Sequence, residues 1–121
     1  MTLNRRWRCG WLLAGVLSAA PALAVNLGFL NDAPYTHFTE ADRKLFDDTL
    51  IDVLSHGADG QAREWSNPAT RAGGEIKPLK SFDRAGASCR TVSIRNAAKG
   101  RSETGQYSFC KDDSGAWKLA Q

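Results

Sequence analysis

The cysteines and histidines are the residues of this chain best suited to metal or covalent chemistry, and both types are few. The chain has three cysteines, Cys9, Cys89 and Cys110, and two histidines, His37 and His56. Zinc sites use four such ligands, which come mostly in pairs at short, regular spacings. These residues do not have that spacing, so the sequence predicts no metal site and no cofactor.

Catalysis by serine or by paired carboxylates has little support in the sequence. Serine catalysis needs a positioned base and an oxyanion device, and none of Ser55, Ser88 or Ser108 lies in a nucleophile elbow. His56 ends a predicted helix, where a partly charged imidazole interacts favourably with the helix dipole. Most acidic residues fall on one helix face or in turns. We therefore expect no enzyme, with a peptidoglycan-active enzyme or an inhibitor of such an enzyme as the alternative.

The first 24 residues have the composition of a cleavable secretory signal peptide. Arg5, Arg6 and Arg8 precede an apolar run at 9–20, which is too short to span a bilayer. Pro21 ends this run, and the small-any-small pattern at 22–24 predicts cleavage after Ala24. An uncleaved anchor and export by the twin-arginine route are the less favoured alternatives. The expected location is the periplasm or the cell surface, where the chain would be associated with the outer membrane.

Export would change the charge and the cysteine content of the chain. Three of the sixteen basic residues would leave, and thirteen would remain against thirteen acidic residues. The basic isoelectric point is therefore no evidence for a nucleic-acid partner. Cys9 would leave as well, so Cys89 and Cys110 would be an even pair in an oxidising compartment. We expect one domain at 39–121 after an irregular lead-in at 25–38, with no transmembrane span.

A helix is predicted at 39–56, and strands are predicted after it. Apolar residues recur there at helical spacing, and the stripe comprises Leu45, Phe46, Thr49, Leu50, Val53 and Leu54. Thr39 and Asp42 form a predicted capping box, and Gly57 is the predicted C-cap. From Gly60 onward the period changes to two, which favours strands at 61–67, 75–82, 88–96, 103–111 and 116–120. Pro78 predicts a sheet edge or a bulge.

The hairpin formed by the third and fourth strands has a register that the sequence can specify. Folding it about Lys99-Gly100 places Cys89 opposite Cys110 and Val92 opposite Tyr107. One face of the hairpin is then apolar, and the other carries the cysteines and hydroxyl side chains. The fold class is therefore α+β: one amphipathic helix packed on a four- to five-stranded antiparallel sheet with one disulfide.

The order of these residues resembles a known family. After a helix come Asp59-Gly60, Trp65, Asn67, Gly74, Ile76 and Pro78, then Cys89-Arg90, and then Gly105, Cys110, Asp113, Gly115 and Trp117. This order resembles the surface antigen domain, the C-terminal domain of the rickettsial seventeen-kilodalton surface antigen and related bacterial envelope proteins. The resemblance extends from about Leu45 to Lys118. It implies an envelope domain without known catalytic residues. Outer-membrane anchoring does not carry over, because the lipidated cysteine and glycine-rich segment of many relatives are not found here.

Binding of an envelope partner is the predicted function, and the partner would be an envelope protein or an anionic envelope component. Residues 25–59 carry a net charge of minus five and residues 60–121 a net charge of plus five. A solvated acidic helix beside a basic sheet rim is the simpler explanation, and a basic binding surface is the functional one. An exposed Trp65 would add an aromatic anchor, although a core or edge-packing position is the favoured explanation. The candidate contact residues are Trp65, Lys77, Lys80, Arg84, Arg95, Lys99 and Arg101.

Overall fold

A computed structural model describes residues 34–120 of the chain. A short 3-10 helix, η2 (Pro34–His37), is followed by α1 (Glu40–His56) and by five strands. The strands are β1 (Arg63–Asn67), β2 (Ala72–Arg84), β3 (Ala87–Ala98), β4 (Arg101–Lys111) and β5 (Trp117–Leu119). The predicted signal peptide, and the greater part of the predicted lead-in, lie outside the described residues.

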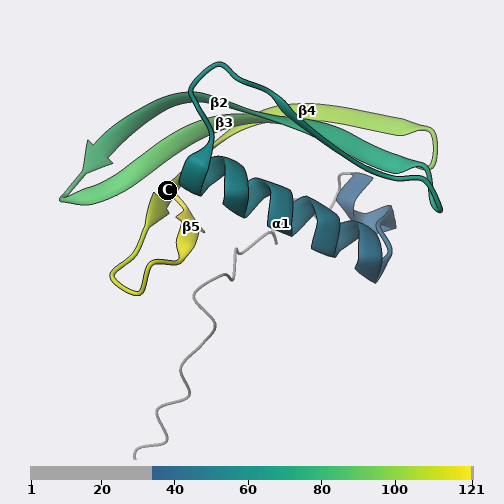
Figure 1. The fold of residues 1–121 in the computed structure, drawn as a ribbon, viewed down its shortest axis with the longest axis horizontal. Helices are drawn as coiled ribbons and strands as arrows, with labels where there is room; N and C mark the ends of the chain where they lie inside the picture. The colour runs from purple at the N-terminus through teal and green to yellow at the C-terminus, as the bar shows by residue number, and fades with distance from the viewer. Residues whose placement is uncertain (1–33, 121) are drawn as a thin grey trace, which may run out of the picture.

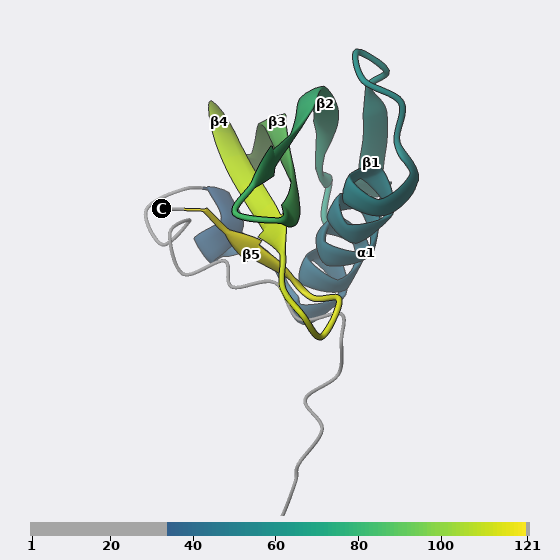
Figure 2. The same ribbon diagram turned by 90° about the vertical axis from the view of Figure 1, so that its left-hand side faces the viewer.

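The strands form one antiparallel sheet in the order β1-β2-β3-β4-β5, so each strand pairs with its neighbour in the sequence. The sheet curves over α1, which runs beneath its concave side (Figure 1). A view turned by 90° shows the same two layers, with β5 at the opposite side from β1 (Figure 2). The predicted α+β class, with one helix on an antiparallel sheet, is confirmed.

The helix begins and ends where its capping residues predict. The side chain of Thr39 accepts a hydrogen bond from the Asp42 backbone N–H, and the Asp42 carboxylate accepts one from the Thr39 N–H. Gly57 is the C-cap, and its N–H donates to the carbonyl of Val53 at 2.9 Å. One member of the predicted stripe is misplaced, because Leu45 is 39% exposed. Helical drift turns this position to the edge of the apolar face.

All five strands form, and the main difference from the prediction is the length of β2. Pairing with β1 through Trp65 and Gly74 extends β2 back to Ala72. The predicted bulge at Pro78 is present, because the register with β3 shifts between Pro78 and Lys80. β1 pairs with β2 only as far as Ile76. Pro78 therefore lies where the ladder with β1 has ended and no hydrogen bond from its nitrogen is required.

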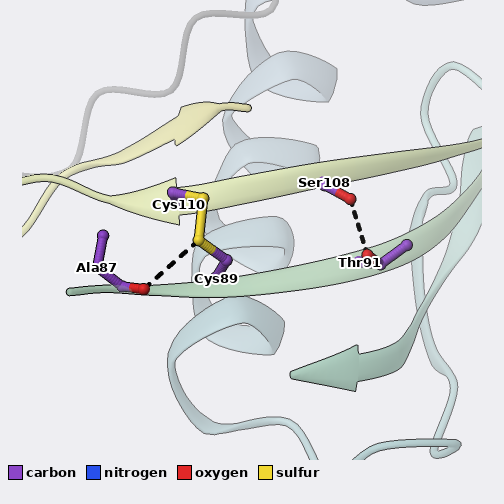
Figure 3. The surroundings of a disulfide bond; sticks show 5 residues. All are labelled: Ala87, Cys89, Thr91, Ser108 and Cys110. Atoms are coloured by element: carbon purple, nitrogen blue, oxygen red, sulfur yellow. Dashed lines mark hydrogen bonds between the residues drawn. A yellow bond between two sulfur atoms is a disulfide. The ribbon is translucent and has the colours of Figure 1, made fainter. Parts of the chain in front are cut away.

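The β3–β4 hairpin has the predicted register. Cys89 is the partner of Cys110, and Val92 is the partner of Tyr107. The two cysteines form a disulfide across the strands, and the hydroxyls of Thr91 and Ser108 lie 2.7 Å apart beside it. Figure 3 shows both pairs bridging β3 and β4 with the helix behind them.

Candidate functional site

The two faces of the sheet have different compositions. The inner face, which faces α1, contributes Trp65, Ile76, Val92, Ile94 and Phe109 to the core. These side chains pack with the buried residues of the helix, which are Phe46, Leu50, Val53 and Leu54. The outer face carries the disulfide, Thr91, Ser108 and a series of basic residues. Within residues 34–120 no helix packs on this outer face.

Trp65 belongs to the inner face, and the expectation of an exposed aromatic anchor there is wrong. Its side chain is 5% exposed, and its ring contacts Phe38 and Phe46 with centroid distances of 5.0 Å and 5.8 Å. Phe38 follows η2, so the end of the predicted lead-in closes the core over the tryptophan. Trp65 is therefore a packing residue, which was the favoured explanation from the sequence.

Gly74 explains how the tryptophan fits. A Cβ atom at Gly74 would lie 2.0 Å from the carbonyl oxygen of Arg95 and 2.9 Å from Trp65 Nε1. The register places Gly74 between Trp65 on β1 and Asn96 on β3. Close packing of backbone and indole thus requires glycine at this position.

Arg90 fixes the C-terminal end of the helix to the inner face. Its Nη1 donates to the carbonyls of Val53 and Leu54 at 2.8 Å and 3.2 Å, and its Nη2 contacts Asp59 Oδ1 at 2.6 Å. Arg90 is 8% exposed, so this charge is neutralised inside the domain. It therefore cannot contribute to a basic surface.

Asp42 has the corresponding role at the N-terminal end of the helix. Its carboxylate is 1% exposed and accepts hydrogen bonds from Asn67 Nδ2 and Thr70 Oγ1, each at 2.7 Å. Burial would raise the pKa of Asp42, but the hydrogen bonds from Thr70, Thr39 and Asn67 outweigh it and lower the pKa. Asp42 therefore joins the helix to the β1–β2 turn as a structural carboxylate.

Asp47 is the titratable group with the largest upward shift among the described residues. Burial, followed by the neighbouring Asp48 carboxylate, raises the pKa of Asp47 to about 6. Burial also raises the pKa of Tyr35, and the charge of Asp47 adds to that effect. A carboxylate with such a pKa could transfer protons, but no histidine, cysteine or second shifted carboxylate is paired with it among the hydrogen bonds of residues 34–120. We assign it no reaction.

An open hollow of about 680 Å³ lies between the C-terminal end of α1, the β2–β3 hairpin and β5. Ser55, Ser88 and Trp117 are among its lining residues. Ser55 Oγ accepts a hydrogen bond from Trp117 Nε1 at 3.2 Å, so that hydroxyl is engaged by the core. Asp59, also in the lining, is paired with Arg90. The hollow lacks the base and the oxyanion device that hydrolytic chemistry requires.

The predicted basic surface is divided by the fold. Lys80 and Arg84 share a face with Cys89, because they pair with Thr91 and Ala87 on β3. Lys77, opposite Ser93, lies on the same face before the bulge. Along the outer side of β2 there is no acidic residue from Lys77 to Arg84, since Asp83 alternates to the other side.

The other basic candidates lie elsewhere. Arg95 pairs with Glu75 across the strands, so its charge has an acidic neighbour. Lys99 and Arg101 belong to the β3–β4 turn at the far end of the sheet, roughly 35 Å along β3 from Arg84. The fold therefore brings together Lys77, Lys80 and Arg84 and separates them from Arg95, Lys99 and Arg101.

Phe82 is the residue of this region that the sequence analysis missed. It lies opposite Cys89 on the outer face, with Lys80 Nζ 5.7 Å and Arg84 Cζ 5.9 Å from its ring centroid. The bulge also leaves Leu79 without a partner on β3, and its side chain is 36% exposed. The spacing of Lys80, Phe82 and Arg84, which places all three on one side of a strand, would have indicated this surface.

Comparison with known protein families identifies the chain. Residues 52–118 match the family described as the 17 kDa outer membrane surface antigen. The chain belongs to this family, and the resemblance predicted from its sequence is confirmed. The family supports an exported, envelope-associated location. No curated protein and no solved structure matches the chain.

The described part of the chain shows neither a metal site nor a membrane-crossing helix. Residues 34–120 contain no group of three or more histidine, cysteine, aspartate or glutamate side chains that could hold a metal ion. Within the same residues, no helix is both long and apolar enough to cross a bilayer.

Proposed function

We propose that this protein is a non-catalytic envelope domain that binds an anionic envelope component through the outer face of its sheet. The observation that carries this proposal is the cluster of Lys77, Lys80 and Arg84 on the outer side of β2, where no acidic residue lies between Lys77 and Arg84. We name these three residues the basic cluster. Three cations on one rigid strand attract an anionic surface and release its counter-ions.

The contrast with the remainder of the domain supports a binding role. Two cations of the inner face are paired with acidic side chains: Arg90 with Asp59, and Arg63 with Asp52. The basic cluster instead follows the distal half of β2, where pairing with β1 has ended. A rigid sheet that holds like charges close together gains nothing in folding stability from doing so.

Catalysis on peptidoglycan is the less supported alternative. The hollow beside α1 contains Asp59 and Asp83, but Asp59 is engaged by Arg90. Glycoside hydrolysis requires two free carboxyl groups facing each other across the substrate. Turnover of cell-wall fragments by the purified protein, lost on Asp83→Asn, would support this alternative instead.

Co-sedimentation with vesicles tests the proposal. The protein is expressed as the full chain, purified from the envelope fraction and mixed with vesicles of phosphatidylglycerol or of phosphatidylcholine alone. We expect binding to the anionic vesicles only, weakening as salt rises from about 20 to 150 mM because the charges are screened. Salt-independent binding, or equal binding to both vesicle types, would refute an electrostatic binding face.

A further inference from the structure

We infer that the strand segment at 79–84 is a membrane-docking element whose apolar side chains enter the interface of an anionic lipid layer. This inference rests on the proposed function and adds a specific ligand, the phosphate-bearing surface of a bilayer, and a specific depth of contact. The segment, named here the docking strand, comprises Leu79, Lys80, Phe82 and Arg84.

The composition of the docking strand fits an interface better than it fits a soluble anion. Leu79 is 36% exposed at the bulge, and Phe82 lies on the outer face between two cations. A free phosphate would use the charges and leave the leucine and phenylalanine in water. At a membrane the apolar side chains enter the acyl boundary while lysine and arginine remain at the level of the phosphates.

The position of the docking strand leaves it accessible among the described elements. The last backbone contact on its free side is from Gly60 N–H to the carbonyl of Pro78, at 2.6 Å. The β2–β3 hairpin then continues past the C-terminal end of α1 (Figure 1). Both apolar residues therefore lie on the part of β2 that extends beyond its ladder with β1.

The rigidity of the hairpin explains how two apolar residues can suffice for binding to a lipid surface. Leu79 lies at the bulge between Pro78 and Lys80, and the disulfide ties Cys89, the cross-strand partner of Phe82, to β4. Side chains held in place lose little conformational entropy on binding, so a small contact retains more of its free energy.

The test uses two tryptophan reporters in the exported protein purified from cells that express the full chain. Leu79→Trp places an indole on the docking strand, and Thr104→Trp is the matched control on the outer face of β4, far from that strand. Brominated lipids quench a tryptophan only where it contacts the acyl region. We expect quenching of the first reporter and none of the second on phosphatidylglycerol vesicles. Equal quenching of both would overturn the assigned docking strand.

Charge variants separate this inference from the proposed function. Replacing Lys80 and Arg84 with Gln should weaken vesicle binding about 30-fold, whereas Lys99→Gln with Arg101→Gln should change it by less than about threefold. If the first pair has no effect, the proposed function fails. The double substitution at Lys80 and Arg84 can instead weaken binding while Leu79→Trp is not quenched. The basic cluster then binds the surface electrostatically, and only the insertion of the docking strand is refuted.

Discussion

The inner and outer faces of one sheet show two uses of charged residues. On the inner face Arg90 is almost completely buried and bound to helix carbonyls and to Asp59. On the outer face Lys80 and Arg84 lie on either side of Phe82, and no acidic residue lies between them on that side of β2. A buried charge is kept because its partners fold with it. An array of like charges on the surface adds no stability, and binding explains it better.

Gly74→Ala should cause the largest loss of stability, because it forces the inner layer apart. The added Cβ would lie 2.0 Å from the Arg95 carbonyl, and the backbone must shift. We expect the free energy of unfolding in urea to fall by about 3 kcal/mol or more. Gly100→Ala is the control, since its Cβ meets open space and only its positive φ is strained, at about 1 kcal/mol. Equal losses in the two variants would contradict the packing explanation.

Reduction of the disulfide measures how much the outer face contributes to the free energy of unfolding. Opening the link between Cys89 and Cys110, separated by 21 residues, should lower the free energy of unfolding by about 3 kcal/mol. Urea unfolding with and without reductant measures this loss. The Cys89→Ala, Cys110→Ala double variant is the control and should not respond to reductant. A wild-type transition unchanged by reductant would count against a structural disulfide.

Arg90→Met should cost about 2 kcal/mol, because it leaves Asp59 and the helix carbonyls without their donor. Arg63→Met is the matched inner-face control. Its partner Asp52 is exposed, and loss of such a pair costs less than about 1 kcal/mol. Thermal and urea unfolding of both variants would measure which substitution causes the larger loss of stability. A control variant as unstable as Arg90→Met would show that burial does not set the cost.

Asp42→Asn should lower the free energy of unfolding by about 1 kcal/mol at neutral pH. It should also change how stability falls on acidification. The pKa of Asp42 is lowered in the folded state, so its stabilising effect is complete above the ordinary aspartate pKa and is lost as pH falls through the folded value. The wild type should therefore lose stability on acidification below about pH 4 more steeply than Asp42→Asn. Glu40→Gln, in the same helical turn, should keep the steep wild-type slope.

Asp47→Asn should change stability least of these variants. Unlike the other substitutions, it should stabilise the domain at high pH. The folded-state pKa of about 6 lies above the ordinary value of about 4, so the wild type loses stability as pH rises between these two values. The variant should melt a few degrees higher than wild type at pH 8, and the two should melt together at pH 4. Thermal melts at these two pH values measure the effect. A variant less stable than wild type at pH 8 would contradict the raised pKa.

The sequence predicted the architecture because several local patterns agreed. The capping box of Thr39 and Asp42 set the helix start, and the cysteine pair, alternation and turn of the β3–β4 hairpin specified one register. Agreement among independent patterns is what makes a fold predictable.

The sequence could not place residues whose role depends on distant contacts. Asp42 is buried only because Asn67 and Thr70 donate to it, and these partners lie 25 and 28 residues away. Trp65 had no neighbour that fixed its face, so its burial depended on pairing with Gly74. The basic candidates looked like one set in the sequence, but a hairpin carries Lys99 and Arg101 to the end of the sheet opposite Arg84.

Hydrogen–deuterium exchange with and without phosphatidylglycerol vesicles tests the central claim, that the outer face at the distal half of β2 is the binding surface. The backbone amides at 79–84 and in the β2–β3 turn should gain protection on vesicles, while α1 and the β3–β4 turn at 98–101 should exchange as they do in solution. Protection concentrated on α1 or on the β3–β4 turn, with none at 79–84, would contradict the account.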